Sequence, residues 1–132
     1  MTIQIRQISG STSEATIRGH AVAIDRPAEK GGTDVGPMGG ELFLAAIGGC
    51  FMSNFLAAIK ARQAQVSNVQ TEVTGTIEDS PARFSQIELS VSADCAEGDL
   101  LDKLVQIADH GCIMMNTLRD KLDLKVRIAA RD

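Results

Sequence analysis

The pattern of apolar and polar positions divides the chain into strand-like and helix-like segments. Stretches rich in β-forming residues alternate with turn residues such as Gly10-Ser11 and Gly19-His20 in the first third of the sequence. Two long alternating stretches follow later, on either side of the turn Asp79-Ser80-Pro81, and a last one stands near the end. The pattern predicts six strands: Thr2–Ser9, Glu14–Arg18, Ala21–Asp25, Val66–Glu78, Arg83–Ala93 and Leu124–Ala130.

The helical segments have a different pattern. A helix is predicted from Glu41 to about Gln63, and its interior between Leu42 and Ile59 contains no charged residue. An amphipathic helix at Asp99–His110 and a short one at Cys112–Lys121 follow, separated by Gly111. This order of elements predicts one α+β domain over residues 1–132, with antiparallel strands. The segment Arg26–Gly40, rich in Gly and Pro, is too long for an ordinary connection and is expected to be a functional loop.

The uncharged helix interior allows two interpretations. Its length reaches the lower limit of a membrane span, about 18 residues, but Gly48-Gly49 and Ser53-Asn54 lower its hydrophobicity and the rest of the chain is polar. We therefore expect no membrane partner and a fully buried helix, apolar on all faces. One small sheet cannot cover every face of such a helix, and the two glycines allow another backbone to approach, so we expect a homodimer packed through it.

The composition disfavours several classes of partner and site. A net charge of −4, only 3% aromatic residues and the absence of Trp and Tyr disfavour a nucleic-acid partner. The first residues lack the pattern of a signal peptide, so a cytoplasmic location is expected. The chain has 3 cysteines, an odd number without metal-ligand spacing, and we expect free thiols and no metal site. His20 and His110 do not complete such a site.

Cys50 lies in the apolar helix and Cys112 follows Gly111. Each has an ordinary structural explanation, because free cysteine packs as a small buried hydrophobe. The residues that flank the two cysteines favour a reactive role instead. The segment GPMGGELFLAAIGGC, ending at Cys50, resembles the conserved helix start of the OsmC/Ohr family of hydroperoxide reductases, in its "PMELLLAALGGC" subgroup. The segment ADHGC followed by NTL, around Cys112, is similar to the second cysteine motif of that family.

This resemblance implies an OsmC/Ohr-like α+β fold, in which antiparallel sheets wrap around a long buried central helix in an intimate homodimer. It implies a peroxidase in which the Cys50 thiolate attacks an organic hydroperoxide and becomes a sulfenic acid. Cys112 would then form a disulfide with Cys50, which an external dithiol would reduce. No metal, flavin or nicotinamide cofactor is implied. Arg18 resembles the arginine that stabilises the thiolate, and a buried thiolate needs a nearby cation; alternatively, Arg18 only ends an exposed strand.

Several positions depart from the pattern of the family. The glutamate that holds the arginine is replaced by Gly40, and the proline and serine of the second motif are replaced by Ile113 and Met115. Glu41 is about 180° around the helix from Cys50, and it either contacts the substrate or caps the helix.

The other candidates also have structural alternatives. Phe51 and Met115 are candidate substrate contacts, although a methionine at a helix start is more often part of the core. His110 either tunes Cys112 or interacts with a helix end, and Cys95 matches no motif. The departures leave a second hypothesis open: a non-catalytic or redox-sensing OsmC-like protein that holds a small apolar ligand at the dimer interface.

Overall fold

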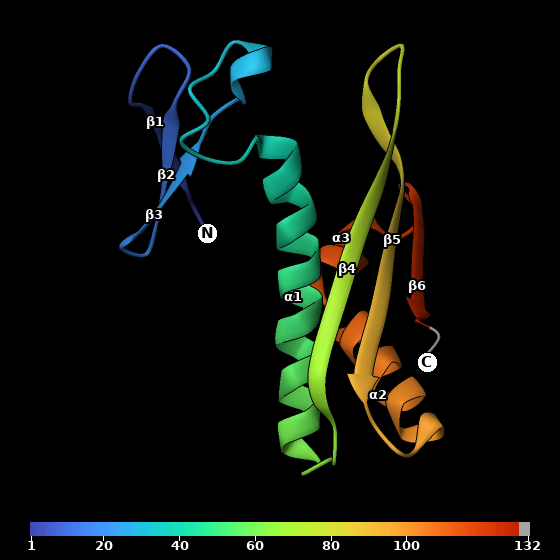
Figure 1. The fold of residues 1–132 in the computed structure, drawn as a ribbon. Helices are drawn as coiled ribbons and strands as arrows, with labels where there is room; N and C mark the ends of the chain where they lie inside the picture. The colour runs from blue at the N-terminus through green and yellow to red at the C-terminus, as the bar shows by residue number, and fades with distance from the viewer. Residues whose placement is uncertain (130–132) are drawn as a thin grey trace. The chain divides into compact units, whose positions relative to one another are not determined.

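The computed structural model describes residues 1–129, so Ala130, the last residue of the predicted final strand, lies outside the described residues. Contacts divide the chain into two compact units, Met1–Phe43 and Leu44–Asp132. The long helix α1, Gly39–Ala61, begins in the first unit and continues into the second (Figure 1).

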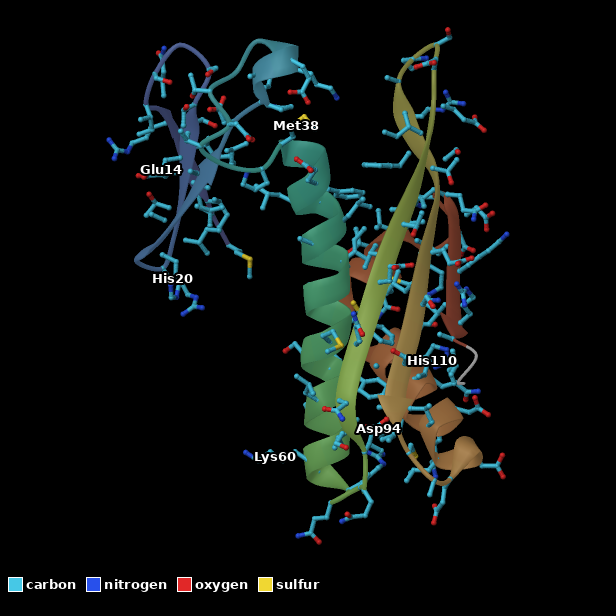
Figure 2. All side chains as sticks on the ribbon, viewed as in Figure 1. Glu14, His20, Met38, Lys60, Asp94 and His110 are labelled. Atoms are coloured by element: carbon cyan, nitrogen blue, oxygen red, sulfur yellow. The ribbon has the colours of Figure 1, made fainter. Side chains whose placement is uncertain are left out.

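The N-terminal unit contains an antiparallel sheet with the strand order β1-β2-β3. Its strands are β1 (Gln4–Gln7), β2 (Ser13–Ile17) and β3 (His20–Ile24). They confirm the three predicted strands, with β1 shorter than predicted and β2 and β3 each shifted by one residue toward the N-terminus. Ile17 pairs with His20, so only Arg18 and Gly19 connect β2 to β3. Both have positive φ, 48° and 84°, as a two-residue hairpin turn requires. The exposed Arg18 therefore lies in the turn at the tip of the hairpin. Figure 2 shows the side chain of His20, the first residue after this turn.

The loop after β3 is organised around a buried carboxylate. It contains only one short 3-10 turn, η1 (Ala28–Lys30), which agrees with the irregular segment predicted there. Asp25 is 3% exposed. One of its oxygens, Oδ2, accepts hydrogen bonds from the Thr12 hydroxyl at 3.0 Å, from the Thr33 hydroxyl at 2.6 Å, and from the N–H groups of Thr33 and Val35 at 3.2 and 3.3 Å. These bonds close the loop without regular secondary structure.

The C-terminal unit contains a second sheet, with the order β4-β5-β6, and three helical segments. Strands β4 (Ser67–Glu78) and β5 (Arg83–Asp94) form the predicted hairpin, and two helices, α2 (Gly98–Gly111) and α3 (Ile113–Leu118), connect it to β6 (Asp123–Ile128). β6 lies parallel to β5, with Leu89 opposite Val126. The prediction of antiparallel strands was therefore wrong for this pair, because the two intervening helices return the chain in the same direction.

The sheet of the C-terminal unit has one apolar and one polar face. Alternate residues of β5 from Ile87 to Ala93 are buried, as are the apolar positions of α2. On the polar face, Arg127 of β6 forms an ion pair with Glu88 of β5 at 2.8 Å. The apolar face therefore packs against the helices and forms the core of this unit.

Within a single chain, helix α1 is buried on one face only. Burial on all faces was predicted for the homodimer and stays a prediction. The buried residues of α1 share one face of the helix: Ile47, Gly48, Phe51, Phe55 and Ala58. A Cβ at Gly48 would lie 2.7 Å from Val73 of β4, so this glycine lets α1 approach the sheet of its own chain, whereas Gly49 has open space around it. Leu56, on the other face, is 50% exposed.

Among residues 1–129, α1 alone is long and apolar enough to cross a membrane by length and composition. Its packing against β4 gives a different reason for that composition. The two aromatic rings on its buried face, Phe51 and Phe55, lie 6.0 Å apart within the core.

Candidate functional site

Cys50 and Cys112 lie together in the C-terminal unit, although they come from different elements. Cys50 belongs to α1, and its side chain is half-buried. Cys112 stands between α2 and α3 with extended backbone angles, φ −84° and ψ 118°, and is fully buried. The Cys112 thiol donates a hydrogen bond to the Cys50 sulfur. The fold therefore brings the two predicted reactive cysteines into contact.

The start of α3 supplies the other donors to this pair. Burial raises the pKa of the Cys50 thiol, but hydrogen bonds from the N–H of Met114, the thiol of Cys112 and the N–H of Ile113 outweigh burial, so the pKa lies below its ordinary value. For Cys112, burial raises the pKa, and donation to Cys50 adds to this rise despite the N–H of Met115. The two thiols are therefore unequal: Cys50 is the better thiolate, and Cys112 keeps its proton.

Asn54 supports the same site and was not among the predicted residues. Its Nδ2 donates to the Cys50 carbonyl oxygen at 2.9 Å and approaches the Cys50 sulfur at 4.0 Å. A Cβ at Gly111 would lie 3.4 Å from the Asn54 side-chain oxygen, so the end of α2 lies close to this part of α1. The signal in the sequence was the spacing, because residues four apart share one face of a helix.

The donors of Ile113 and Met114 also went unpredicted. They are main-chain groups, and a cysteine directly before a helix places the free N–H groups of the first turn near a sulfur. Sequence reasoning required a cation for the Cys50 thiolate. In the described part of the C-terminal unit, N–H and S–H donors lower the pKa instead.

The candidate substrate contacts occupy different environments. Phe51 is completely buried and Met115 is 1% exposed, so both belong to the core and offer almost no surface to a ligand. Glu41 is exposed, and its Oε1 accepts a hydrogen bond from the N–H of Met38 at 2.8 Å, as a residue that caps the start of α1 does. This favours the capping interpretation.

The remaining candidates lie outside the cysteine pair. Arg18 belongs to the N-terminal unit, at the hairpin tip, and its role beside Cys50 stays a prediction. His110 is exposed in the last turn of α2, and its carbonyl accepts a hydrogen bond from Asn116. The Cys95 sulfur contacts the carbonyl of Glu97 at 3.1 Å. Within residues 1–129, no cluster of three or more His, Cys, Asp or Glu residues is arranged to hold a metal ion.

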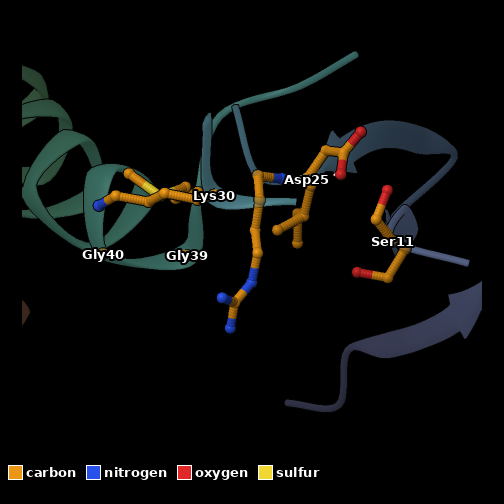
Figure 3. A pocket seen from close by; sticks show the side chains of 9 residues that line it. Ser11, Asp25, Lys30, Gly39 and Gly40 are labelled. Carbon is orange, nitrogen blue, oxygen red and sulfur yellow. Dashed lines mark hydrogen bonds between the residues drawn. The ribbon is translucent and has the colours of Figure 1, made fainter. Parts of the chain in front are cut away.

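A pocket of about 430 Å³ lies within the N-terminal unit (Figure 3). Ser11, Asp25, Lys30, Gly39 and Gly40 are among the residues that line it. Because the Asp25 oxygens already accept hydrogen bonds from the surrounding loop, this carboxylate is committed to structure rather than to a ligand.

The fold has counterparts among solved structures. An OsmC-like protein from Mycoplasma pneumoniae has a TM-score of 0.84 at 16% identity, with 97% of this chain and 94% of that chain covered. An organic hydroperoxide resistance protein, OsmC, from Legionella pneumophila has a TM-score of 0.76 at 19% identity, with 98% of both chains covered. The organic hydroperoxide resistance protein OhrB of Bacillus subtilis has a TM-score of 0.69 at 20% identity, again with 98% of both chains covered. At these identities, the likeness shows the fold.

Among proteins with curated functions, none matches the chain. A family model, by contrast, matches most of the sequence. The model described as OsmC-like protein covers residues 31–127, which include both cysteines and all of α1. The chain therefore belongs to the OsmC-like protein family.

Proposed function

We propose that this protein is a thiol-dependent peroxidase that reduces organic hydroperoxides to alcohols. The observation that carries the proposal is the inequality of the two contacting thiols, because a peroxidase of this kind needs one thiolate and one protonated partner. Two of the similar structures are named organic hydroperoxide resistance proteins, which is consistent with this chemistry.

The reaction requires only the two cysteines and an external dithiol. The Cys50 thiolate attacks the terminal oxygen of the hydroperoxide, the O–O bond breaks, and the alkoxide takes a proton from water and leaves as an alcohol. Cys50 becomes a sulfenic acid. The Cys112 sulfur then attacks the Cys50 sulfur, and a disulfide forms with release of water. Two exchange steps with a dithiol restore both thiols and leave the reductant as a disulfide.

The surroundings of Cys50 support the first step. In the family pattern a glutamate holds the arginine beside the cysteine, and this chain has Gly40 in place of that glutamate. The N–H groups of Ile113 and Met114 stabilise the Cys50 thiolate here. We propose that Arg18 adds a positive charge to the reacting peroxide. This assignment rests on the resemblance of its sequence context and on its position in an exposed turn.

The exposed face of α1 supports a homodimer. Ala45, Ala46, Gly49, Leu56 and Ala57 are apolar and exposed on this helix. Exposed apolar surface on a central helix favours association with a second copy, which would complete the core and bury each α1. Sedimentation equilibrium should therefore give a dimer at micromolar concentration, and a monomer there would contradict this part of the proposal.

Cysteine replacement tests the proposed activity. Cumene hydroperoxide consumption with dithiothreitol should fall to background in Cys50→Ser, because the nucleophile is removed. In Cys112→Ser, the Cys50 sulfenic acid should persist and be trapped by dimedone. Cys95→Ser is the matched control and should keep wild-type turnover. In the same assay, Arg18→Ala should slow turnover, and Arg18→Lys should restore part of it.

Mass spectrometry supplies the second measurement. Cumene hydroperoxide should convert the wild-type protein to a form with a Cys50–Cys112 disulfide. An oxidised protein that keeps both thiols would disprove the mechanism. A small apolar ligand that copurifies with the protein, together with no dithiol-dependent turnover, would favour the alternative of a binding or redox-sensing protein in the cytoplasm.

A further inference from the structure

Arg119 connects the two helical segments on either side of Cys112. It follows α3 directly, and its Nη2 lies 3.0 Å from the Asp109 carboxylate, 3.3 Å from the Asp109 carbonyl oxygen and 3.0 Å from the side-chain oxygen of Asn116. Asp109 belongs to the last turn of α2, and Asn116 belongs to α3. One guanidinium nitrogen thus joins the end of α2 to the body of α3.

Cys112 is held inside this arrangement by its own main chain. Its N–H donates to the same Asp109 carbonyl oxygen at 3.2 Å, and its carbonyl accepts the N–H of Asn116 at 2.9 Å. The Asn116 side chain donates in turn to the carbonyl of His110 at 2.9 Å. Asp109, Asn116 and Arg119, which we call the junction clamp, therefore surround the backbone on both sides of Cys112.

We propose that Arg119 is a positioning residue for the cysteine pair: by closing the junction clamp, it holds the Cys112 thiol and the first N–H groups of α3 against the Cys50 sulfur. This inference rests on the proposed function for its importance to turnover. The positioning itself concerns only the geometry of the reduced thiols.

Electrostatics support the same assignment. The pKa of Arg119 lies above its ordinary value, chiefly through the hydrogen bond to Asp109, against the effect of burial and with attraction from Asp109, Asp120 and Cys112. The Arg119 side chain is 39% exposed, and partly exposed ion pairs contribute little to global stability, so substitutions here should leave the protein folded.

The test measures the reactivity of Cys50 in the reduced full-length protein. In Arg119→Gln, the junction loosens and Cys50 loses part of its donor set. Its alkylation by iodoacetamide, followed by mass spectrometry across pH, should shift to higher pH and slow at neutral pH by up to about tenfold, the size expected when a hydrogen bond to a charged group is lost. Arg119→Lys, which keeps the charge, should recover part of the rate. Arg127→Gln breaks an ion pair on the polar face of the sheet and should match the wild type.

A second variant checks that the clamp acts as a unit. Asp109→Asn should slow alkylation in the same direction, and the double variant should be no slower than Arg119→Gln alone, because partners in one network are not additive. After oxidation by cumene hydroperoxide, dimedone should trap more Cys50 sulfenic acid in Arg119→Gln than in the wild type, since Cys112 is less well placed.

Two outcomes separate this inference from the proposed function. A wild-type alkylation profile in a folded Arg119→Gln protein, judged by circular dichroism, would overturn the positioning role. A shifted profile together with no hydroperoxide turnover by the wild type would support the positioning role and disprove the peroxidase.

Discussion

The Asp25 carboxyl group and the Cys50 thiol both accept hydrogen bonds from main-chain N–H groups. They differ in how far the acidic group itself is exposed to solvent. Asp25, in the N-terminal unit, accepts N–H groups from Arg26, Thr33 and Val35 as well as hydroxyl hydrogen bonds. Cys50, in the C-terminal unit, accepts hydrogen bonds from two main-chain N–H groups, from the Cys112 thiol and, at 4.0 Å, from the Asn54 side chain, and it stays half-buried. Both have a pKa below the ordinary value.

The difference shows how the same donors serve structure in one place and chemistry in another. Each Asp25 oxygen already has a partner, and the side chain is buried, so this anion orders its loop and cannot meet a ligand. The Cys50 sulfur is larger and more polarisable, has fewer donors and keeps surface, so its anion can still attack a substrate. Donor number and exposure together separate the two roles.

Removing the Asp25 carboxylate should give the largest effect on stability. In Asp25→Ala, the donors of the buried loop lose their acceptor, and unsatisfied buried donors are costly. We expect the melting temperature to fall by about 5 °C or more, measured by calorimetry or circular dichroism. Glu29→Ala, an exposed position in the same loop, is the control and should leave the melting temperature unchanged.

The pH dependence sharpens this prediction. The Thr33 hydroxyl, against the effect of burial and with help from the Arg26 N–H, holds the pKa of Asp25 well below its ordinary value. The folded state thus binds this proton less readily than the unfolded state. The stability from Asp25 should be fully present above about pH 4 and be lost as the pH falls below it. An Asp25→Asn protein with the same acid dependence as the wild type would show that other carboxyl groups cause it.

Cys50 should respond to the loss of a single N–H donor. In Ile113→Pro, the N–H disappears, while proline is tolerated in the first position of a helix and Cys112 already has the extended backbone that a following proline requires. The pKa of Cys50 should rise, and its alkylation at neutral pH should slow severalfold, measured with iodoacetamide and mass spectrometry.

The control for this change keeps the donor. Ile113→Ala shortens a side chain that is 69% exposed and retains the N–H, so Cys50 should react at the wild-type rate. Equal slowing in both variants would mean that the side chain of Ile113, rather than its N–H, supports the thiolate, and the parallel with Asp25 would fail.

The sequence predicted the elements better than their directions and contacts. The uncharged run before and after Cys50 located α1, which the structure has at Gly39–Ala61. The antiparallel prediction failed at β6, although helices between two strands of one sheet indicate a parallel pair. The sequence predicted that α1 is buried on all faces with the help of a second subunit. A single chain covers one of these faces, and burial of the other stays a prediction.

The two reactive cysteines were predicted from the sequence motifs around them. Their contact could be known only from the fold. From the sequence we predicted a cation near Cys50. The main-chain N–H donors were missed because residue types do not reveal where main-chain groups point. Arg119 was missed for a related reason: its partners, Asp109 and Asn116, are separated along the chain and meet only where α2 ends and α3 begins.

Glu41 provides the smallest test, since it is an exposed acid with one N–H partner, Met38. In Glu41→Ala, the helix loses a cap whose charge is already well solvated, so the free energy of unfolding should fall by less than about 1 kcal/mol, measured by urea titration. Glu41→Gln keeps an oxygen acceptor and should lose less. Hydroperoxide turnover should stay at the wild-type level in both. Slower turnover with unchanged stability would instead make Glu41 a substrate contact. The hydrogen bond to the Met38 N–H would then not be its main role.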